Sequence, residues 1–239
     1  MIITDLNMEE FTEGLRQTQT IVLPFGSVEE HGKHLPLGTD TYQMFEIAKL
    51  AAQKRPLFVG PPVFYGLCRS TREHPGTISI KGQTLRALTL DLLEAYFQQG
   101  LRNFLVLSGH AGGTHLAFLI DAGEEFIEKY KGAKVAVASI LDLLRSAAQD
   151  LLETPQDSHA GEFETSLMLH FYPRLVKGTS PEEYPRFPRP FLVRNKRRFW
   201  PGGVWGDPRK ASPKKGKKFA QRLAEAIVQL ANQIEILED

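Results

Sequence analysis

The stretch NFLVLSGHAGGTHLAFLIDAGEEFIEKYKGAKVAVASI, residues 103–140, contains an apolar run, an amphipathic segment and a second apolar run. The apolar runs, 103–109 and 134–140, are continuous rather than alternating, which is typical of strands buried on both faces of a parallel sheet. The segment 115–130 between them has the length and periodicity of a helix. This order of strand, helix and strand predicts an α/β fold.

The rest of the chain continues this alternation. On the N-terminal side, Asn7 and Glu10 form the capping box of a first helix that ends near Gln17. The other expected elements are a buried strand at 20–26, a helix from Asp40, a strand-like region at 56–66 and helices at 84–97, 141–153, 161–169 and 217–237. The segment between the last two helices is proline-rich and is expected to be a loop.

Length and composition indicate one domain. The chain has 239 residues, of which 42% are hydrophobic, enough to bury the core of a single α/β domain. We therefore expect residues 1–239 to form one three-layer α/β/α domain with a mainly parallel central sheet. Ligands of such sheets bind beyond the carboxyl ends of the strands, so the loops after 20–26 and 103–109 are the expected places for a site.

Charge and cysteine content restrict the possible function classes. The formal net charge is +1, and no apolar stretch reaches the roughly 18 residues that cross a bilayer, so we expect no membrane partner. The N-terminus does not resemble a secretory signal. Cys68 is the only cysteine, which excludes an internal disulfide and a cysteine-based zinc cluster. We expect a cytoplasmic protein.

The segment EEHGKHLPLGTD, residues 29–40, places several potential metal ligands directly after the first strand. Glu29 and His31 are two residues apart, so in an extended segment they point to the same side. Asp40 follows after a turn. The alternatives are a solvated loop and, for Asp40, a helix cap completed by Gln43. His34 could contact substrate, support a ligand or be a polar turn residue.

Two further clusters carry histidines. In SGHAGGTH, His110 lies between a strand end and a helix, facing the expected crevice, and the pattern of a phosphate-binding loop is missing. His115 fits the first turn of a helix better than a ligand position. In DSHAGEFETS, residues 157–166, His159 and Glu162 are three apart and would share one side of a helical turn. A capped helix start explains that segment equally well.

Together the clusters offer only nitrogen and oxygen ligands. Such a set suits zinc, manganese or iron(II), and there are enough donors for two ions that share one carboxylate. Paired ions lower the pKa of a bound water to near 7, which produces a hydroxide nucleophile at neutral pH. Hydrolysis is therefore the leading expectation.

These segments together resemble the creatininase (creatinine amidohydrolase) family. The resemblance rests on LPFGSVEEHGKHLPLGTD, EHPGTISI, LVLSGHAGG, HAGEFETSLML and GVWGDPRKAS, which occur in the family's order and spacing over about residues 15–220. It implies an α/β/α metal-dependent amidohydrolase, a homohexamer, with a metal-bound hydroxide that attacks a C–N bond of a cyclic amide, a formamide or a related small molecule.

The resemblance also implies roles for individual residues. The positions that match metal ligands of the two divalent ions (zinc, manganese or iron) are Glu29, His31, Asp40 and His110, with Asp40 as the bridge. His159 matches the catalytic histidine, and Glu164 matches the acidic residue near it.

The chain departs from creatininases proper at several positions. Gly112 stands where they carry a glutamate, and Leu141 and Pro155 stand where they carry tryptophans that enclose creatinine. Creatinine itself is therefore not the expected substrate. We expect Glu162 to replace the missing glutamate as a metal ligand and Glu164 to support His159. Other branches of the family are formamidopyrimidine deformylases and a peptidase of mycofactocin maturation, and the latter activity is an alternative.

A basic stretch lies near the C-terminus. Residues 186–218 contain twelve Lys or Arg and one acidic residue, Asp207, interleaved with aromatic residues. Such a stretch can bind single-stranded nucleic acid or phosphate, or it can attract an anionic substrate. A solvated surface or a subunit contact is the simplest explanation. We expect a small-molecule substrate with an anionic group, and no nucleic-acid partner.

Overall fold

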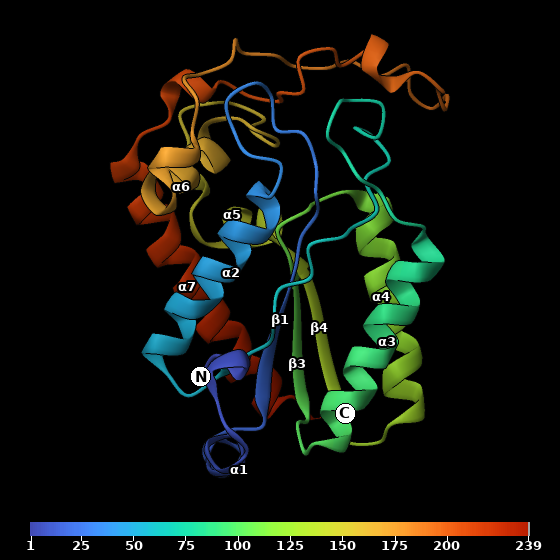
Figure 1. The fold of residues 1–239 in the computed structure, drawn as a ribbon, viewed down its shortest axis with the longest axis vertical. Helices are drawn as coiled ribbons and strands as arrows, with labels where there is room; N and C mark the ends of the chain where they lie inside the picture. Colours follow the sequence, from blue (N-terminus) through green and yellow to red (C-terminus); the bar gives the residue numbers. More distant parts are fainter. Residues whose placement is uncertain (239) are drawn as a thin grey trace.

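Four strands form a parallel sheet in the order β2-β1-β3-β4 (Figure 1). The computed structural model describes residues 1–238, and the strands span Thr20–Phe25 (β1), Phe58–Val59 (β2), Asn103–Ser108 (β3) and Lys134–Ser139 (β4). β1 pairs with β3 along its whole length, and Phe25 is level with Ser108. The three long strands therefore end at one edge of the sheet, the upper edge in Figure 1.

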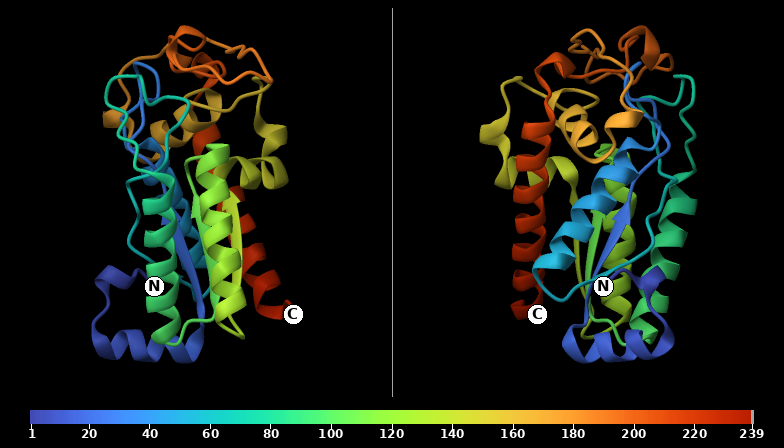
Figure 2. Two further views of the ribbon diagram at one scale, coloured as in Figure 1. Left: turned by 90° about the vertical axis from the view of Figure 1, so that its right-hand side faces the viewer. Right: turned by 60° about the vertical axis from the view of Figure 1, so that its left-hand side comes forward.

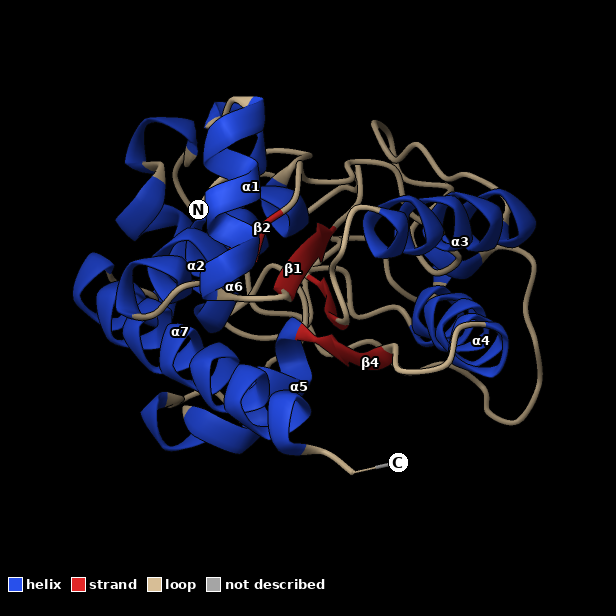
Figure 3. Cartoon of the chain, turned by 90° about the horizontal axis from the view of Figure 1, so that it is seen from below, coloured by secondary structure: helices blue, strands red, loops and turns tan. Residues whose placement is uncertain are grey.

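Helices cover both faces of the sheet (Figure 3). On one face lie α3 (Gly82–Gln98) and α4 (Gly113–Lys129). On the other face lie α2 (Thr39–Lys54), α5 (Ile140–Ala147), α6 (Glu162–Phe171) and α7 (Pro213–Ile236). The first helix, α1 (Met8–Gln17), lies at the lower end of the molecule in Figure 1.

The strands explain this layering because successive side chains point to opposite faces. Val22 and Leu105 pack in the hydrophobic core shared with α2 and α7. Their neighbours Ile21 and Val106 pack in the core shared with α3 and α4. All four side chains are fully buried, as the continuous apolar runs predict. The predicted α/β fold with a parallel sheet and helices on both faces is confirmed.

Most element boundaries agree with the sequence pattern, and the differences occur at element ends. The capping box of Asn7 and Glu10 is present at the start of α1. The strand-like region 56–66 contains only the two residues of β2. The helix expected over 141–153 stops at Ala147, and α7 begins four residues earlier than expected, after the cap Ser212.

The alternative in which Asp40 caps a helix is wrong. The N-cap of α2 is Gly38, so Asp40 lies in the first helical turn. Its carboxylate contacts Ser27 and two histidines rather than the backbone of the helix.

Loops occupy the upper end of the molecule. The segment 180–207 runs across this end in all three side views (Figures 1 and 2), above the edge at which the strands finish. Among residues 1–238, no helix has both the length and the apolar character that crossing a membrane requires.

Candidate metal centre

Three chain segments converge beyond the carboxyl ends of β1 and β3. The loop after β1 leads into α2, the loop after β3 leads into α4, and the segment before α6 returns to the same place. Their ligand atoms form three groups in which all atoms lie within 4.8 Å of one another: Glu29–His31–His159, Glu29–Cys68–His110 and His31–Asp40–Glu164. Every member of these groups is buried, apart from the half-buried His159. The predicted clusters thus meet in one site.

Gly109 allows the loop after β3 to approach α2 closely. A Cβ atom at this position would lie 2.0 Å from the backbone oxygen of Asp40. The Gly109 amide also donates to the carbonyl of Phe25 at the end of β1, at 2.8 Å. A glycine is therefore needed for the packing that brings His110 and Asp40 together.

Asp40 lies between two histidines. Its Oδ1 is 3.0 Å from Nε2 of His31, and its Oδ2 is 3.3 Å from Nδ1 of His110. The hydroxyl of Ser27 donates to Oδ2 at 2.7 Å and so fixes the carboxylate plane. One oxygen directed toward each histidine is the placement that a ligand shared by two ions needs.

Each histidine has a second carboxylate neighbour. Oε2 of Glu29 lies 2.7 Å from Nδ1 of His110. Oε2 of Glu164 lies 3.6 Å from Nε2 of His31. The site therefore consists of two halves that meet at Asp40, and each half offers one imidazole nitrogen and carboxylate oxygens, which are ligands of zinc, manganese and iron.

Backbone carbonyls determine which nitrogen of each histidine is free. Nδ1 of His31 donates to the carbonyl of Glu29 at 3.0 Å, and Nε2 of His110 donates to the carbonyl of Leu67 at 3.3 Å. A carbonyl oxygen only accepts, so these nitrogens carry the protons. The nitrogens that face Asp40 are therefore the ones available as ligands, an arrangement common around metal-binding histidines.

The electrostatics of the site also favour cations. Burial alone would lower the pKa of His31, but the charges of Asp40 and Glu164 outweigh it and raise that pKa to about 10. Burial opposes the shift at His110 too, and the charge of Glu29 raises its pKa well above the usual value. Without metal, protons on both histidines balance the buried carboxylates. Divalent ions can take over that role, so the donor set fits a metal site.

His159 lies beside this site and interacts with Glu30. Its Nε2 donates to the carbonyl of Glu30 at 2.8 Å and is 3.5 Å from the carboxylate oxygen Oε1 of the same residue. The His159 ring also lies 4.2 Å from the ring of His31 and 5.1 Å from that of Trp200. Burial and the charge of His31 lower the pKa of His159, but Glu30 and Glu29 raise it more, and the net shift is upward.

The prediction that Glu162 is a metal ligand is wrong. Its carboxylate accepts from the backbone amides of Glu153 and Thr154 and forms an ion pair with Lys215 at 2.5 Å. A carboxylate held by a lysine and two amides is not available to a metal ion. Glu164 occupies the place expected for Glu162, because its Oε2 belongs to the group with His31 and Asp40.

Helical spacing does not relate His159 to Glu162, because α6 begins only at Glu162. His159 precedes the helix, and Ala160 has a left-handed φ of 49° that turns the chain between them. His159 and Glu162 consequently point in different directions. Glu164 is fixed by hydrogen bonds from the Ala160 amide at 2.6 Å and the Gln43 side chain at 3.0 Å, and it supports His31 rather than His159.

The two uncertain histidines are structural. His34 is buried between the hydroxyls of Ser180 and Thr165, at 2.9 and 2.8 Å. His115 lies in the first turns of α4, as expected, where its Nδ1 accepts from the amide of Leu67 at 3.1 Å. Because Leu67 also accepts from His110, His115 helps to orient that ligand candidate. Neither His34 nor His115 belongs to a potential ligand group among residues 1–238.

Gly112 is explained by the position of His110. A Cβ atom at residue 112 would lie 2.4 Å from Nε2 of His110. A glutamate here, as in creatininases proper, would force this histidine to move. The observed orientation of His110 therefore requires a glycine at position 112.

Several contacts were missed by the sequence argument. Thr71 donates to Oε1 of Glu29, and Cys68 places its thiol beside Glu29 and His110. Burial raises the pKa of this thiol to about 12. A serine, a threonine and a single cysteine in a loop carry no pattern that would have identified them.

A pocket of about 230 Å³ opens above the site. Glu29, Asp40, His110, His159 and Glu164 line its base. The residues that line its remaining walls include Arg69, Ser70, Arg189, Trp200 and Trp205. Leu141 and Pro155 line a separate, neighbouring cavity instead.

Comparisons with known sequences agree with these features. Residues 4–231 match the family described as Creatininase: Creatinine amidohydrolase. The chain is 29% identical over 188 residues to the 3-dehydro-scyllo-inosose hydrolase of Thermotoga maritima, covering 72% of this chain and 56% of that protein. It is 28% identical over 172 residues to the creatinine amidohydrolase of Pseudomonas putida, covering 65% of each. The chain thus spans less than two thirds of the length of these two relatives.

A third relative is covered more fully. The mycofactocin precursor peptide peptidase of Mycobacterium tuberculosis is 30% identical over 236 residues, with 89% of this chain and 84% of that protein covered. Among solved structures, creatinine amidohydrolase (creatininase) superposes with a TM-score of 0.88 at 23% identity, covering 99% of this chain and 98% of that one. Creatininase structures described as a manganese form and a Zn–Zn type have TM-scores of 0.86 and 0.85, each at 24% identity and 97% coverage of both chains.

Proposed function

Because the chain belongs to the creatininase family of hydrolases, we propose that it is a metal-dependent amidohydrolase that cleaves a carbon–nitrogen bond in a small substrate. The observation that carries the proposal is the placement of Asp40, with one carboxylate oxygen toward His31 and the other toward His110. Two buried half-sites that share one carboxylate are suited to a pair of divalent ions.

In this proposal, Glu29, Asp40 and His110 hold one ion, and His31, Asp40 and Glu164 hold the other. Zinc, manganese and iron are all compatible with these nitrogen and oxygen ligands. Bound ions would lower the pKa of a water molecule toward neutrality and so supply a nucleophile.

His159 is proposed to manage the proton of the leaving nitrogen. Because Nε2 of His159 donates to Glu30, Nδ1 is the nitrogen that remains for exchange with the substrate. The net upward shift of the pKa of His159 favours the protonated ring, which is the form that a general acid requires. The packing of Trp200 against its ring restricts its orientation.

The pocket supports a small substrate. Its volume of about 230 Å³ is below the roughly 300–1,000 Å³ of sites for drug-sized ligands. Creatinine itself is not the expected substrate. Leu141 and Pro155, which stand where creatininases proper carry enclosing tryptophans, line a neighbouring cavity and do not enclose this pocket. Peptide hydrolysis is a second candidate, favoured by the coverage of the mycofactocin precursor peptide peptidase.

A substrate panel tests the proposal. Metal-free protein would be restored with zinc, manganese or iron and assayed on cyclic amides, formamides and short peptides. We expect turnover only with metal, and the class of substrate cleaved fastest separates the two candidates. Absence of metal-dependent cleavage of every carbon–nitrogen bond in the panel would contradict the proposal.

His159→Ala provides the mechanistic control. The side chain is not needed for either proposed half-site, so the variant should keep its metal content. It should lose turnover by roughly a hundredfold or more, the contribution of a general acid. Loss of one ion in elemental analysis of His159→Ala would instead make His159 a ligand.

A further inference from the structure

The rim of the pocket has the opposite charge from its base. The base contains the carboxylates of Glu29, Asp40 and Glu164, whereas Arg69 and Arg189 line the wall. A second cavity of about 350 Å³ adjoins the pocket, and Ser70, Arg189 and Trp205 line both. Lys196 lines this second cavity. Three cationic side chains from two separate segments thus surround the entrance.

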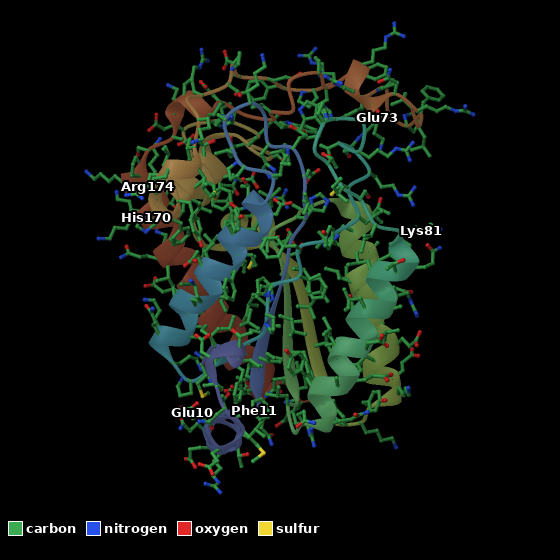
Figure 4. All side chains as sticks on the ribbon, in the orientation of Figure 1. Glu10, Phe11, Glu73, Lys81, His170 and Arg174 are labelled. Carbon is green, nitrogen blue, oxygen red and sulfur yellow. The ribbon has the colours of Figure 1, made fainter. Side chains whose placement is uncertain are left out.

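The two segments are held against each other. Glu73, at the upper right in Figure 4, accepts hydrogen bonds from the backbone amides of Lys196 and Arg197, at 2.7 and 3.3 Å. The loop that carries Arg69 is thereby tied to the segment that carries Lys196. Burial lowers the pKa of Lys196, Glu73 raises it, and the like charges of Arg69 and Arg72 lower it further, with a net downward shift. The like charges of Arg69 and Arg72 thus act on Lys196, which lies on the segment that Glu73 holds.

No short ion pair neutralises the three side chains. Within residues 1–238, no carboxylate lies within 4.0 Å of the charged groups of Arg69, Arg189 or Lys196. The nearby Glu73 instead lies 3.7 Å from Arg72. Like charges held near one another with one carboxylate, Glu73, beside them cost electrostatic free energy, which an anionic ligand would offset.

The adjoining cavity is otherwise apolar. Phe187, Pro190, Phe191 and Trp205 are among its lining residues. The partly buried Phe187 and Trp205 reduce the effective dielectric constant around the half-buried Lys196, so a bound anion would interact more strongly there than in open water. The same walls can accept an apolar group next to the anion.

We propose that Arg69, Arg189 and Lys196 form an anion-binding subsite at the pocket entrance, and that the substrate carries a carboxylate or phosphate group which binds there. This inference rests on the proposed hydrolytic function for its meaning, because the anion would place the scissile bond over the acidic base of the pocket. Arg69 lies outside the basic stretch 186–218, so the subsite depends on the fold and not on that stretch alone.

Binding of model anions to metal-free protein tests the subsite. Isothermal titration calorimetry at low salt would use phenyl phosphate, benzoate and the neutral benzyl alcohol. We expect at least one of the two anions to bind more than about tenfold more tightly than benzyl alcohol, because a single charge-assisted contact already supplies about that ratio. The tighter of the two anions identifies the phosphate or carboxylate preference.

Matched variants localise the effect. Arg69→Gln and Arg189→Gln should each weaken anion binding about tenfold, since each removes one charged donor. Arg198→Gln is the control, because Arg198 is exposed on the same basic segment but lines neither cavity. It should change the affinity by less than about twofold. Circular dichroism and thermal unfolding would verify that all three variants fold.

Two results would overturn the subsite. One is binding of both anions no tighter than that of benzyl alcohol. The other is equal weakening by Arg198→Gln, which would indicate a diffuse field and no defined site. Because the titration uses metal-free protein, its failure would leave the metal proposal intact, and a failure to bind metal would leave the titration interpretable.

Discussion

Glu30 is the carboxylate that contacts His159 most directly. Its carbonyl accepts from Nε2 of this histidine, and its buried Oε1 has no hydrogen-bond partner other than this 3.5 Å neighbour among the described residues. The sequence did not indicate a role for Glu30, which lies between the ligand candidates Glu29 and His31. The structure distinguishes it, because Glu29 faces His110 whereas Glu30 faces His159.

We predict that Glu30→Gln lowers the pKa of His159. The neutral amide no longer favours the protonated ring, so the loss of activity on the alkaline side of the pH–kcat profile should move to lower pH. The measurement is the pH profile of the metal-restored protein, with Glu124→Gln, an exposed position on α4, as the control. An unchanged alkaline limb in Glu30→Gln would separate His159 from the proton transfer.

We predict that the buried side chain of His34 makes the free energy of unfolding depend on pH. Burial, followed by the charges of His31 and His159, lowers the pKa of His34 to about 4, below its unfolded value of 6.5. Between these values the unfolded chain binds more protons. The contribution of neutral His34 is therefore complete above pH 6.5 and is lost as the pH falls toward 4.

The measurement is the free energy of unfolding in urea, without metal, for wild type and His34→Gln. The difference between the two proteins should be about 2 kcal/mol smaller at pH 5 than at pH 7, since one pKa unit corresponds to 1.36 kcal/mol. A difference that does not change with pH would show that His34 does not titrate in this way.

At the level of elements, α6 shows where the sequence argument ends. The segment was recognised as a helix and as part of the site, but its first residue was placed one position too early, at Gly161. Asp157 caps the helix through the amides of Glu162 and Phe163, at 2.7 and 2.9 Å. Which side chain caps α6 depends on the left-handed turn at Ala160. Residue spacing in the sequence does not predict such a turn.

Glu162 therefore has a structural role between elements. It connects α6 to α7 through Lys215 and holds the amides of residues 153 and 154. We predict that Glu162→Gln lowers the free energy of unfolding by about 2 kcal/mol, the value of hydrogen bonds to a buried charge. Urea denaturation measures this change.

The same variant should keep its full metal content. Glu164→Gln, two residues later in the same helix, is the matched comparison and should weaken the ion held with His31 and Asp40. Loss of metal from Glu162→Gln but not from Glu164→Gln would reverse this assignment.

At the level of the whole molecule, the alternation of apolar strands and amphipathic helices was sufficient to predict the layers and the edge that carries the site. Glu29, His31, Asp40 and His110 became candidates because they follow strand ends, and the resemblance to the creatininase family implied their roles as ligands. The segment 180–207 could not be placed, because proline-rich loops have no periodicity that would show it to lie across this edge (Figure 2). The sequence therefore did not predict that Arg189 and Lys196 of this segment lie near Arg69 at the pocket.

The central claim is that Asp40 joins two metal half-sites. Elemental analysis of protein loaded with zinc and then freed of excess metal tests it directly, with Glu162→Gln as a control. Wild type should retain close to two ions per chain. Asp40→Ala and the isosteric Asp40→Asn should both lose more metal than Glu29→Ala or His31→Ala, because only Asp40 serves both half-sites. Equal metal content in wild type and in both Asp40 variants, with all proteins folded, would contradict the account.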